Sequence, residues 1–385
     1  MRVLPQLERG AAVLEDYARG RRGAIRVGME CHPCQDWLMR VVGDGTPHYN
    51  AAHVLHETTG RDVMTFGFRG GHPTLTYVFQ ATAAYAGIKL YWGIDLAQPN
   101  DVVVYFYEGN DINDELANLK FLMGPGFDQT RAGERAYIAE TIARIGADGV
   151  KSARRRWHAL RNAHMFDTST KLVKLAIQNA SRGVGRILDP ADPAFRPNAG
   201  YKENWSRYQG ATVFVGKDDG GRPPYPVETV EPFAFQTDAE IALVALWYEE
   251  ALKYLSRLFP GSRIWVSYIP TPIMAYRLAS ETAVLRDLVR EAETDHPGPP
   301  TTFTNAALAE RSNATCARIF QAARAAGTEF IDTRPAWRAA AGKLGYLHGP
   351  NDPGHPNEMG YRVLAEAIQL GMVKPDTAAG CARLK

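Results

Sequence analysis

The stretch DVVVYFYEGND, residues 101–111, decides the fold class of this chain. Six of its first seven residues are apolar, and they follow one another without polar interruption. Such a run is typical of a strand that lies inside a parallel sheet and is covered by helices on both faces. The strand predicted for residues 101–107 ends in the polar turn Glu108-Gly109-Asn110-Asp111.

Working outward from this strand, short apolar runs alternate with helical patterns. Such alternation is typical of α/β proteins with a doubly wound parallel sheet, and the capping-box pattern Thr237-Asp238-Ala239-Glu240 marks the start of one of the helices. With residues 101–107, the expected strands make a five-stranded parallel sheet; the other four are residues 38–42, 62–66, 264–269 and 329–332. Helices are expected at residues 49–58, 74–86, 279–293, 305–326 and 358–370.

The alternation breaks once, which suggests an insertion. Residues 1–36 are interpreted as an N-terminal extension, and residues 37–111 with 237–385 as the α/β core. Between them, residues 112–236 form a mainly helical insertion, helical over 114–183 and irregular over the Pro- and Gly-rich part 184–236. Because the insertion leaves the sheet after one strand end, it is expected to form a lid or a wall of a cleft there.

Composition excludes several classes of protein. The chain has 385 residues, 44 Lys and Arg against 42 Asp and Glu, and a formal charge of +2. An even balance gives no reason to expect nucleic acid as a partner. No stretch of 18 uncharged apolar residues exists, so no membrane span is predicted. The first 20 residues lack the apolar core of a signal peptide.

Unusual polar residues and glycines follow the expected strands, at the edge of a parallel sheet where functional groups gather. The first strand ends in Gly43-Asp44-Gly45-Thr46, the second near Gly70-Gly71, and the third at Asn110. A late loop carries Asp352-Pro353-Gly354-His355.

This ordered set resembles the SGNH (GDSL-type) esterase superfamily over residues 37–111 and 237–372. The resemblance implies a three-layer α/β/α, flavodoxin-like fold and ester chemistry on a glycan, with removal of O-acetyl groups from a polysaccharide as the expected activity. Acyl transfer to a glycan, and a non-catalytic glycan-binding or assembly role, are the alternatives. An acylated glycan or other small ester is the expected partner, and no cofactor is expected. The resemblance also favours a location outside the cytoplasm.

The resemblance assigns roles residue by residue. His355 is the base and Asp352 orients it, while Gly70, Asn110 and the backbone N–H of Gly45 hold the oxyanion. Asp44 and Asp111 are expected to brace their turns. On the insertion, Trp157, Trp205 and Tyr208 are candidates for stacking on sugar rings. In the core, just before the late loop, His348 is expected to be structural or to line the substrate site.

Gly45 departs from the family pattern, because a serine nucleophile stands there in the family and glycine has no hydroxyl. Three interpretations stay open. A native serine has been replaced by engineering, or the chain is a natural member that binds without cleaving, or another group does the chemistry. In the third case Thr46 is the nearest hydroxyl, and His355 could activate a water in the space that the serine side chain leaves.

The cysteines and a basic run have simpler interpretations. Cys31 and Cys34 are expected to form a local disulfide or two free thiols, and a metal site is not expected because no second ligand pair is present. Cys316 and Cys381 are interpreted as isolated. The basic stretch 151–156 is expected to be a solvated helix face, with attraction of an acidic polysaccharide as the functional alternative.

Overall fold

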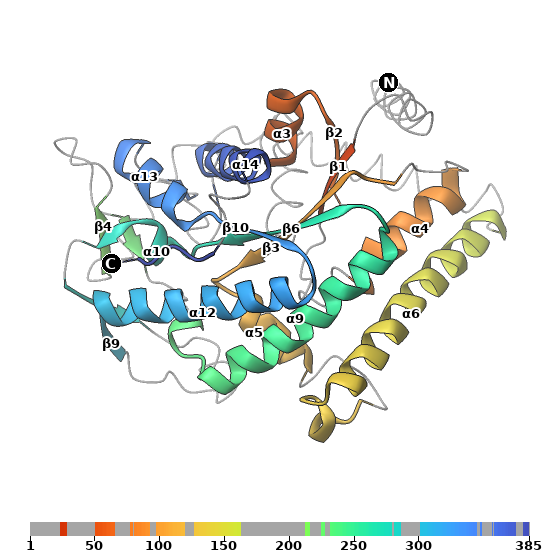
Figure 1. Ribbon diagram of the computed structural model, residues 1–385, viewed down its shortest axis with the longest axis horizontal. Coiled ribbons are helices and arrows are strands. Elements are labelled where there is room, and N and C mark those ends of the chain that lie inside the picture. Colours follow the sequence, from red (N-terminus) through yellow and green to blue (C-terminus); the bar gives the residue numbers. More distant parts are fainter. Residues whose placement is uncertain are drawn as a thin grey trace, which may run out of the picture.

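The protein is described here from a computed structural model, which shows a mixed α/β architecture (Figure 1). The structure describes residues 24–28, 51–65, 78–79, 81–92, 98–119, 127–162, 212–215, 225–227, 232–278, 281–285, 301–344, 347–348, 356, 358–374 and 380–384.

Parallel strands form the centre of the molecule. They pair in the order β10-β6-β3-β1-β2, so that β3 lies in the middle. In the register of the sheet, Val103 of β3 lies opposite Val27 on one side and Trp265 on the other. The strands are β1 (Ala24–Gly28), β2 (Asp62–Thr65), β3 (Asp101–Tyr107), β6 (Arg263–Ile269) and β10 (Glu329–Asp332).

The strand between β2 and β3 differs from the sequence prediction. That position is taken by Ala24–Gly28, which lies within the expected N-terminal extension, whereas the predicted strand 38–42 lies outside the described residues. Both segments are short apolar runs close to a glycine, and pairing partners far along the chain decide which such run joins a sheet.

The residues of β3 alternate between two buried cores, as the pleat of a strand requires. Val103 and Tyr105 belong to one core cluster, and Val102, Val104 and Phe106 belong to the other. Both sets are buried, which confirms the prediction that this strand is covered on both faces.

Helices supply the other side of each core (Figure 1). On one face the core includes residues of α3 (Ala51–Thr59), α13 (Arg334–Leu344) and α14 (Glu358–Val373). On the other face it includes residues of α5 (Asp111–Ala117), α9 (Asp238–Leu258) and α12 (Asn305–Ala325), with Tyr85 of α4 (Ala81–Trp92) packed against it. Short helical turns also occur: η4 (Gln129–Arg131), η7 (Pro232–Ala234) and α10 (Pro272–Ala275).

The predicted start of α9 is confirmed by its hydrogen bonds. The Thr237 hydroxyl accepts the backbone N–H of Glu240 at 3.2 Å, and the Glu240 carboxylate accepts the backbone N–H of Thr237 at 2.7 Å. This reciprocal capping box satisfies two backbone donors that the helix itself cannot satisfy.

The long helix α6 (Arg135–Asn162) of the insertion packs outside α4 and α9. Ile138 and Ile142 share a third core cluster with Trp247 and Ala251 of α9. The Trp247 indole N–H also donates to the carbonyl of Ala132, at 3.0 Å, just before α6 begins. This part of the insertion thus thickens one helical layer, and residues 163–211 lie outside the described part of the chain.

Two small antiparallel sheets replace structure that was predicted otherwise. The first joins β4 (Thr212–Val215), β5 (Tyr225–Val227) and β7 (Arg277–Leu278), so the segment 184–236 is not irregular throughout. The second pairs β8 (Thr282–Leu285) with β9 (Thr301–Thr304), and the helix predicted over 279–293 is wrong at β8. In β8 buried and exposed residues alternate, and pairing with a Thr-rich partner overrides the helical preference of Ala and Leu.

None of the helices within the described ranges is both long and apolar enough to cross a membrane.

Candidate functional site

The candidate site is built around the turn that follows β3. The backbone N–H of Tyr107 donates to the Asp111 carboxylate at 2.7 Å, which closes the turn on itself. Gly109 lies under the Tyr107 ring, and a Cβ at this position would come within 2.4 Å of that ring. Asn110 is the N-cap residue of α5, so it stands at the carboxyl end of the central strand and at a helix N-terminus.

Asn110 and Asp114 form a side-chain pair in this turn. The Asn110 amide donates to the Asp114 carboxylate at 2.7 Å. The pKa of Asp114 is raised to about 7, mainly by burial and then by the nearby carboxylates of Asp111 and Glu115, while the hydrogen bond from Asn110 opposes the shift. A primary amide carries two N–H donors, so one N–H of Asn110 holds Asp114 and a second is left for another acceptor.

Glu108 is the first residue of this turn and is fully buried. Its carboxylate accepts the Tyr268 hydroxyl at 2.9 Å and the backbone N–H of Thr271 at 3.3 Å. Its backbone N–H donates to the carbonyl of Ile269 at 3.0 Å. Burial raises the pKa of this carboxyl, and the Arg334 guanidinium is the strongest opposing influence. These contacts fix the carboxyl ends of β3 and β6 to each other.

Arg334 is a buried cation at the end of β10. It donates to both carboxylate oxygens of Asp332, at 2.9 and 2.8 Å, and to the Ser312 hydroxyl at 3.0 Å. It also donates to the carbonyl of Ala382 at 3.0 Å, while Asp332 accepts the backbone N–H of Ala382 at 2.8 Å. The ion pair of Asp332 and Arg334, whose cation also acts on Glu108, thus holds the C-terminal segment at Ala382.

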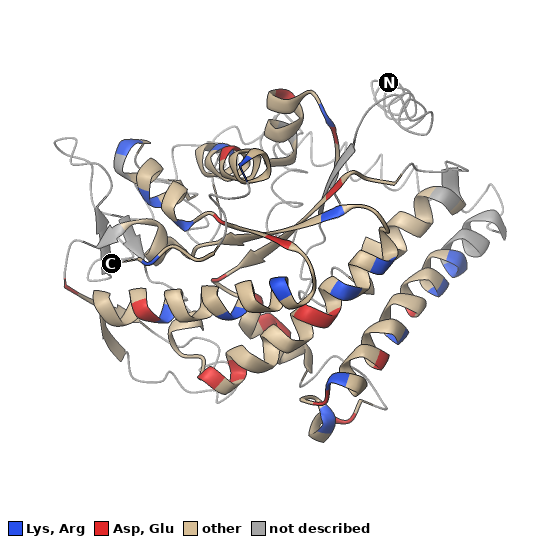
Figure 2. Cartoon of the chain, viewed as in Figure 1, with Lys and Arg blue, Asp and Glu red and all other residues tan. Residues whose placement is uncertain are grey.

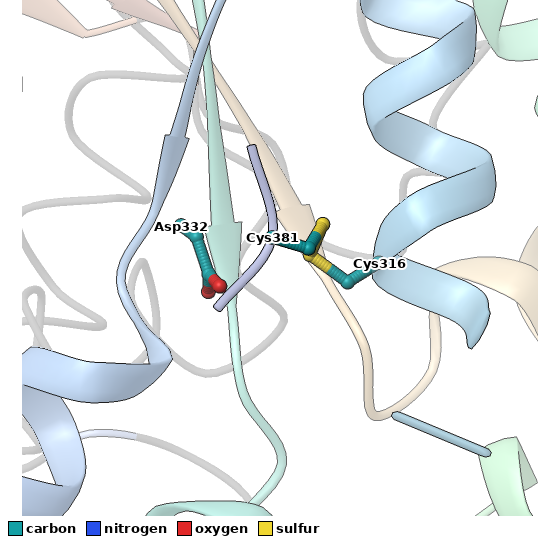
Figure 3. Close-up of side chains that lie close together, drawn as sticks. All are labelled: Cys316, Asp332 and Cys381. Carbon is teal, nitrogen blue, oxygen red and sulfur yellow. A yellow bond between two sulfur atoms is a disulfide. The ribbon is translucent and has the colours of Figure 1, made fainter. Parts of the chain in front are cut away.

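A disulfide joins that C-terminal segment to α12. Cys316 and Cys381 are bonded with Cα atoms 6.0 Å apart across 65 residues of sequence (Figure 3). The interpretation of these two cysteines as isolated is therefore wrong. Nothing in their local sequence marks the pair, because packing of β10 beside α12 brings them together.

Asp332 lies beside the disulfide, and the ligand atoms of the three residues fall within 4.8 Å of one another (Figure 3). Both sulfurs are bonded to each other, so neither offers a thiolate. Both oxygens of Asp332 are already engaged by Arg334 and Ala382. The group is therefore suited to holding the C-terminal segment and not a metal ion.

The residues flanking the Asp352–His355 loop are described, although the loop itself is not. His348 is buried, with Nδ1 2.7 Å from the Tyr276 hydroxyl and its ring 5.1 Å from the ring of Trp337. The Tyr276 hydroxyl also accepts the backbone N–H of Leu347 at 2.7 Å. His348 forms an antiparallel bridge with Pro356. These contacts fit the structural role that is one of the two expected for His348.

The structure describes only part of the predicted site. Asn110 and Asp111 lie in the described turn, and they are brought together with Asp114 and Glu108. The other predicted residues lie outside the described part of the chain: Asp44, Gly45, Gly70, Trp205, Tyr208, Asp352 and His355, together with Cys31 and Cys34.

Trp157 lies in the described helix α6, though its side chain is not described. Arg135 pairs with Glu249, and Gly146 lies beside Tyr254, so α6 and α9 run in the same direction (Figure 1). Trp157 follows Gly146 by 11 residues, about 16 Å of helix. Its backbone thus lies toward the edge where β6 begins, away from the edge that carries Asn110.

The basic run of α6 faces solvent. Lys151, Arg154 and Arg155 are exposed, and Lys151 pairs with Asp148 at 3.1 Å. Figure 2 shows acidic residues interleaved with basic ones along this helix. This arrangement fits the predicted solvated helix face.

Sequence reasoning missed Asp114, and it missed the buried set Glu108, Asp332 and Arg334. Asp114 lies four residues after Asn110, a spacing that places two side chains on the same face of a helix, so its contact could have been found. Arg334 is far from Glu108 along the chain, and no local pattern indicates that the two meet.

Comparison of this chain with protein-family models, with curated proteins and with solved structures gives no match.

Proposed function

We propose that this chain has an SGNH-type site that acts on O-acyl, most simply O-acetyl, groups of a polysaccharide, with Gly45 at the nucleophile position. The observation that carries the proposal is the position of Asn110. Its side-chain amide stands at the carboxyl end of the central parallel strand, in a turn closed by Asp111, and it retains one N–H for an acceptor. An amide so placed suits the stabilisation of an oxyanion.

The layering supports a flavodoxin-like, three-layer interpretation of the fold. Helices pack on both faces of the parallel strands, and β3 lies between β6 and β1 in the strand order. In such sheets ligands bind beyond the carboxyl ends of the strands. Asn110 and Glu108 lie at that edge.

The flanks of the segment 349–355 support the placement of the base. Tyr276 follows β6 by way of α10, and it holds Leu347 and His348. The bridge between His348 and Pro356 keeps the two ends of the segment together. Since β6 neighbours β3, the proposal places Asp352 and His355 beside the Asn110 turn.

The proposed chemistry follows from these groups. Asn110, with the backbone N–H groups of Gly45 and Gly70, would stabilise the tetrahedral oxyanion of an ester. His355, oriented by Asp352, would take a proton from the attacking hydroxyl. With glycine at position 45 that hydroxyl cannot come from a serine, so it would come from a water or from Thr46. As the tetrahedral intermediate collapses and the ester C–O bond breaks, His355 would pass the proton to the departing alcohol. The same site with a sugar hydroxyl as acceptor would transfer the acyl group.

The disulfide supports a location outside the cytoplasm. Structural disulfides persist in oxidising compartments and are rare where thiols are kept reduced. Cys316–Cys381 bonds the C-terminal segment to α12, which accords with a glycan at the cell surface as the substrate.

The test is to restore the missing hydroxyl. Gly45→Ser should create esterase activity on a small acetyl ester such as 4-nitrophenyl acetate. Removal of a nucleophilic serine elsewhere costs about six orders of magnitude in turnover, or about 8 kcal/mol, so the gain should stand far above the background. Asn110→Ala in the Gly45→Ser protein should lose about 2–4 kcal/mol of transition-state stabilisation. His355→Ala should abolish the activity.

The absence of a hydroxyl at Gly45 favours a second candidate, a glycan-binding protein without catalysis. The two candidates differ in the Gly45→Ser protein. If that protein is folded and binds an acetylated oligosaccharide in calorimetry but neither hydrolyses nor transfers the acetyl group, the binding role replaces the enzymatic one.

A further inference from the structure

The side chain of Asn110 can be rotated by half a turn with little change in shape, because its amide oxygen and nitrogen exchange places. Only one of the two orientations allows Asn110 to donate to Asp114, as it does at 2.7 Å. An ionised carboxylate accepts hydrogen bonds and donates none. Ionised Asp114 therefore selects the orientation in which the amide nitrogen faces it.

We propose that Asp114 is the positioning residue of this site, and that its carboxylate fixes the rotation of the Asn110 amide and so determines which donor Asn110 offers to an oxyanion. This inference rests on the proposed function, since it concerns the role of Asn110 there. A protonated Asp114 can instead donate its O–H to the Asn110 carbonyl oxygen, and the amide then turns over. Ionisation of Asp114 thus decides whether the amide nitrogen or the amide oxygen of Asn110 faces Asp114.

The surroundings of Asp114 place the loss of its proton near neutral pH. Burial, with smaller contributions from the carboxylates of Asp111 and Glu115, raises the pKa of Asp114 to about 7. Both of these charges lie on α5 itself. Helix α9 and the turn η7 pack against α5, and neither contributes a charge to Asp114 among the residues that the structure describes.

The first experiment measures the orientation directly and does not depend on catalysis. In the unaltered chain, labelled with ¹⁵N-asparagine, the side-chain amide resonances of Asn110 are assigned by their loss in Asn110→Ala. They are then followed from pH 5.5 to 8.5. The resonances should shift with a midpoint near pH 7, and they should stay constant in Asp114→Asn. Asp148→Asn, which alters an exposed carboxylate on α6, is the matched control and should leave the titration unchanged.

The second experiment measures the consequence for the reaction. In the Gly45→Ser protein, kcat for a small acetyl ester should rise as pH increases through 7. Asp114→Asn should lower kcat about tenfold or more at pH 8 with little change in KM, because full removal of an oxyanion donor costs about 10²- to 10³-fold. The component of the pH profile due to Asp114 should vanish in Asp114→Asn. Asp114→Glu should recover part of the rate.

The outcomes separate this inference from the proposed function. An active Gly45→Ser protein whose rate and pH profile are unchanged by Asp114→Asn would overturn the positioning role and leave the function standing. An inactive Gly45→Ser protein would remove the proposed function, and the amide titration would then decide whether Asp114 orients Asn110. Asn110 resonances that do not respond to pH, or that respond equally in Asp114→Asn, would refute the inference in either case.

Discussion

Loss of the Cys316–Cys381 disulfide should destabilise the fold by a calculable amount. The bond closes a loop of 65 residues. In the chain-entropy model, cross-linking a loop of that length removes about 4 kcal/mol of conformational freedom from the unfolded chain. The double variant Cys316→Ser/Cys381→Ser removes the bond and leaves no unpaired thiol at the site.

The expected shift in melting temperature follows from the length of the chain. Unfolding entropy is about 2.1 cal/mol/K per residue, so a chain of 385 residues has an unfolding entropy of about 0.8 kcal/mol/K. A loss of about 4 kcal/mol then lowers Tm by about 5 °C. Backbone bonds from Ala382 to Asp332 and Arg334 remain in the variant, but they no longer gain from a tethered chain end.

Differential scanning calorimetry with and without a phosphine reductant provides the assay. The reductant should lower Tm of the unaltered protein and leave Tm of the double variant unchanged. Cys31→Ser/Cys34→Ser is the matched control, and it should retain the fall in Tm that the reductant causes at Cys316–Cys381. A double variant that melts within 1 °C of the unaltered protein, or peptide mapping that finds free thiols at Cys316 and Cys381 in the native protein, would refute the reasoning.

Three further predictions concern charge and packing near the site. Asp114 has a raised pKa of about 7 in the folded protein, so the folded state keeps its proton where the unfolded chain has lost it, and stability should fall as pH rises from about 4 to about 7. The difference between the folded and the ordinary pKa of this carboxyl limits the effect to about 4 kcal/mol. Asp114→Asn should flatten this dependence of stability on pH in urea titrations between pH 5 and 8. Arg334→Met should lower the free energy of unfolding by about 3–5 kcal/mol, because Asp332 and Glu108 would stay buried without their cation. Adding Asp332→Asn should recover part of the loss. If the effects of the two substitutions on the free energy of unfolding simply add, the result would count against the ion pair. Gly360→Ala should destabilise the folded protein by more than about 2 kcal/mol, since the added Cβ would come within 2.1 Å of the carbonyl oxygen of Leu347, and this backbone atom cannot move aside. Gly133→Ala is the control, because a Cβ added there meets nothing within 4 Å. Equal melting temperatures for the two variants would contradict the packing argument.

The parts of the fold that sequence predicts are those determined by local chemistry. The apolar run 101–107 predicts a strand covered on both faces, and β3 is confirmed as such. The capping box at Thr237 and Glu240 predicts where α9 begins, because both partners lie within one helical turn. The helix predicted over 305–326 is confirmed as α12, which Thr304 caps through the backbone N–H of Ala307.

The parts that sequence does not predict depend on partners far along the chain. β8 is a strand because β9 pairs with it, and Thr282-Ala283-Val284-Leu285 alone favours neither structure strongly. The Cys316–Cys381 bond forms because the C-terminal segment passes beside α12. In the site, Asn110 and Asp111 follow from a local motif, whereas the contact of Glu108 with Tyr268 joins residues 160 positions apart.

The buried charges of this molecule have a common geometric consequence. Burial of Glu108 and of the Asp332–Arg334 pair is costly, and hydrophobic replacements of buried ion pairs are often as stable. Stability alone therefore does not account for them. Glu108 directly follows β3 and accepts a hydrogen bond from Tyr268 of β6, while Asp332 ends β10 and holds Arg334, which lies within electrostatic reach of Glu108.

The carboxyl ends of three neighbouring strands are consequently fixed relative to one another by directional bonds, which apolar contacts would not provide. Glu108 is also the first residue of the turn that carries Asn110. A group that must stabilise a developing charge needs its donors held in place before the reaction. In the proposed site, the buried network of Glu108, Asp332 and Arg334 would hold the strand ends beneath the Asn110 turn, and Asp114 would hold Asn110 within that turn.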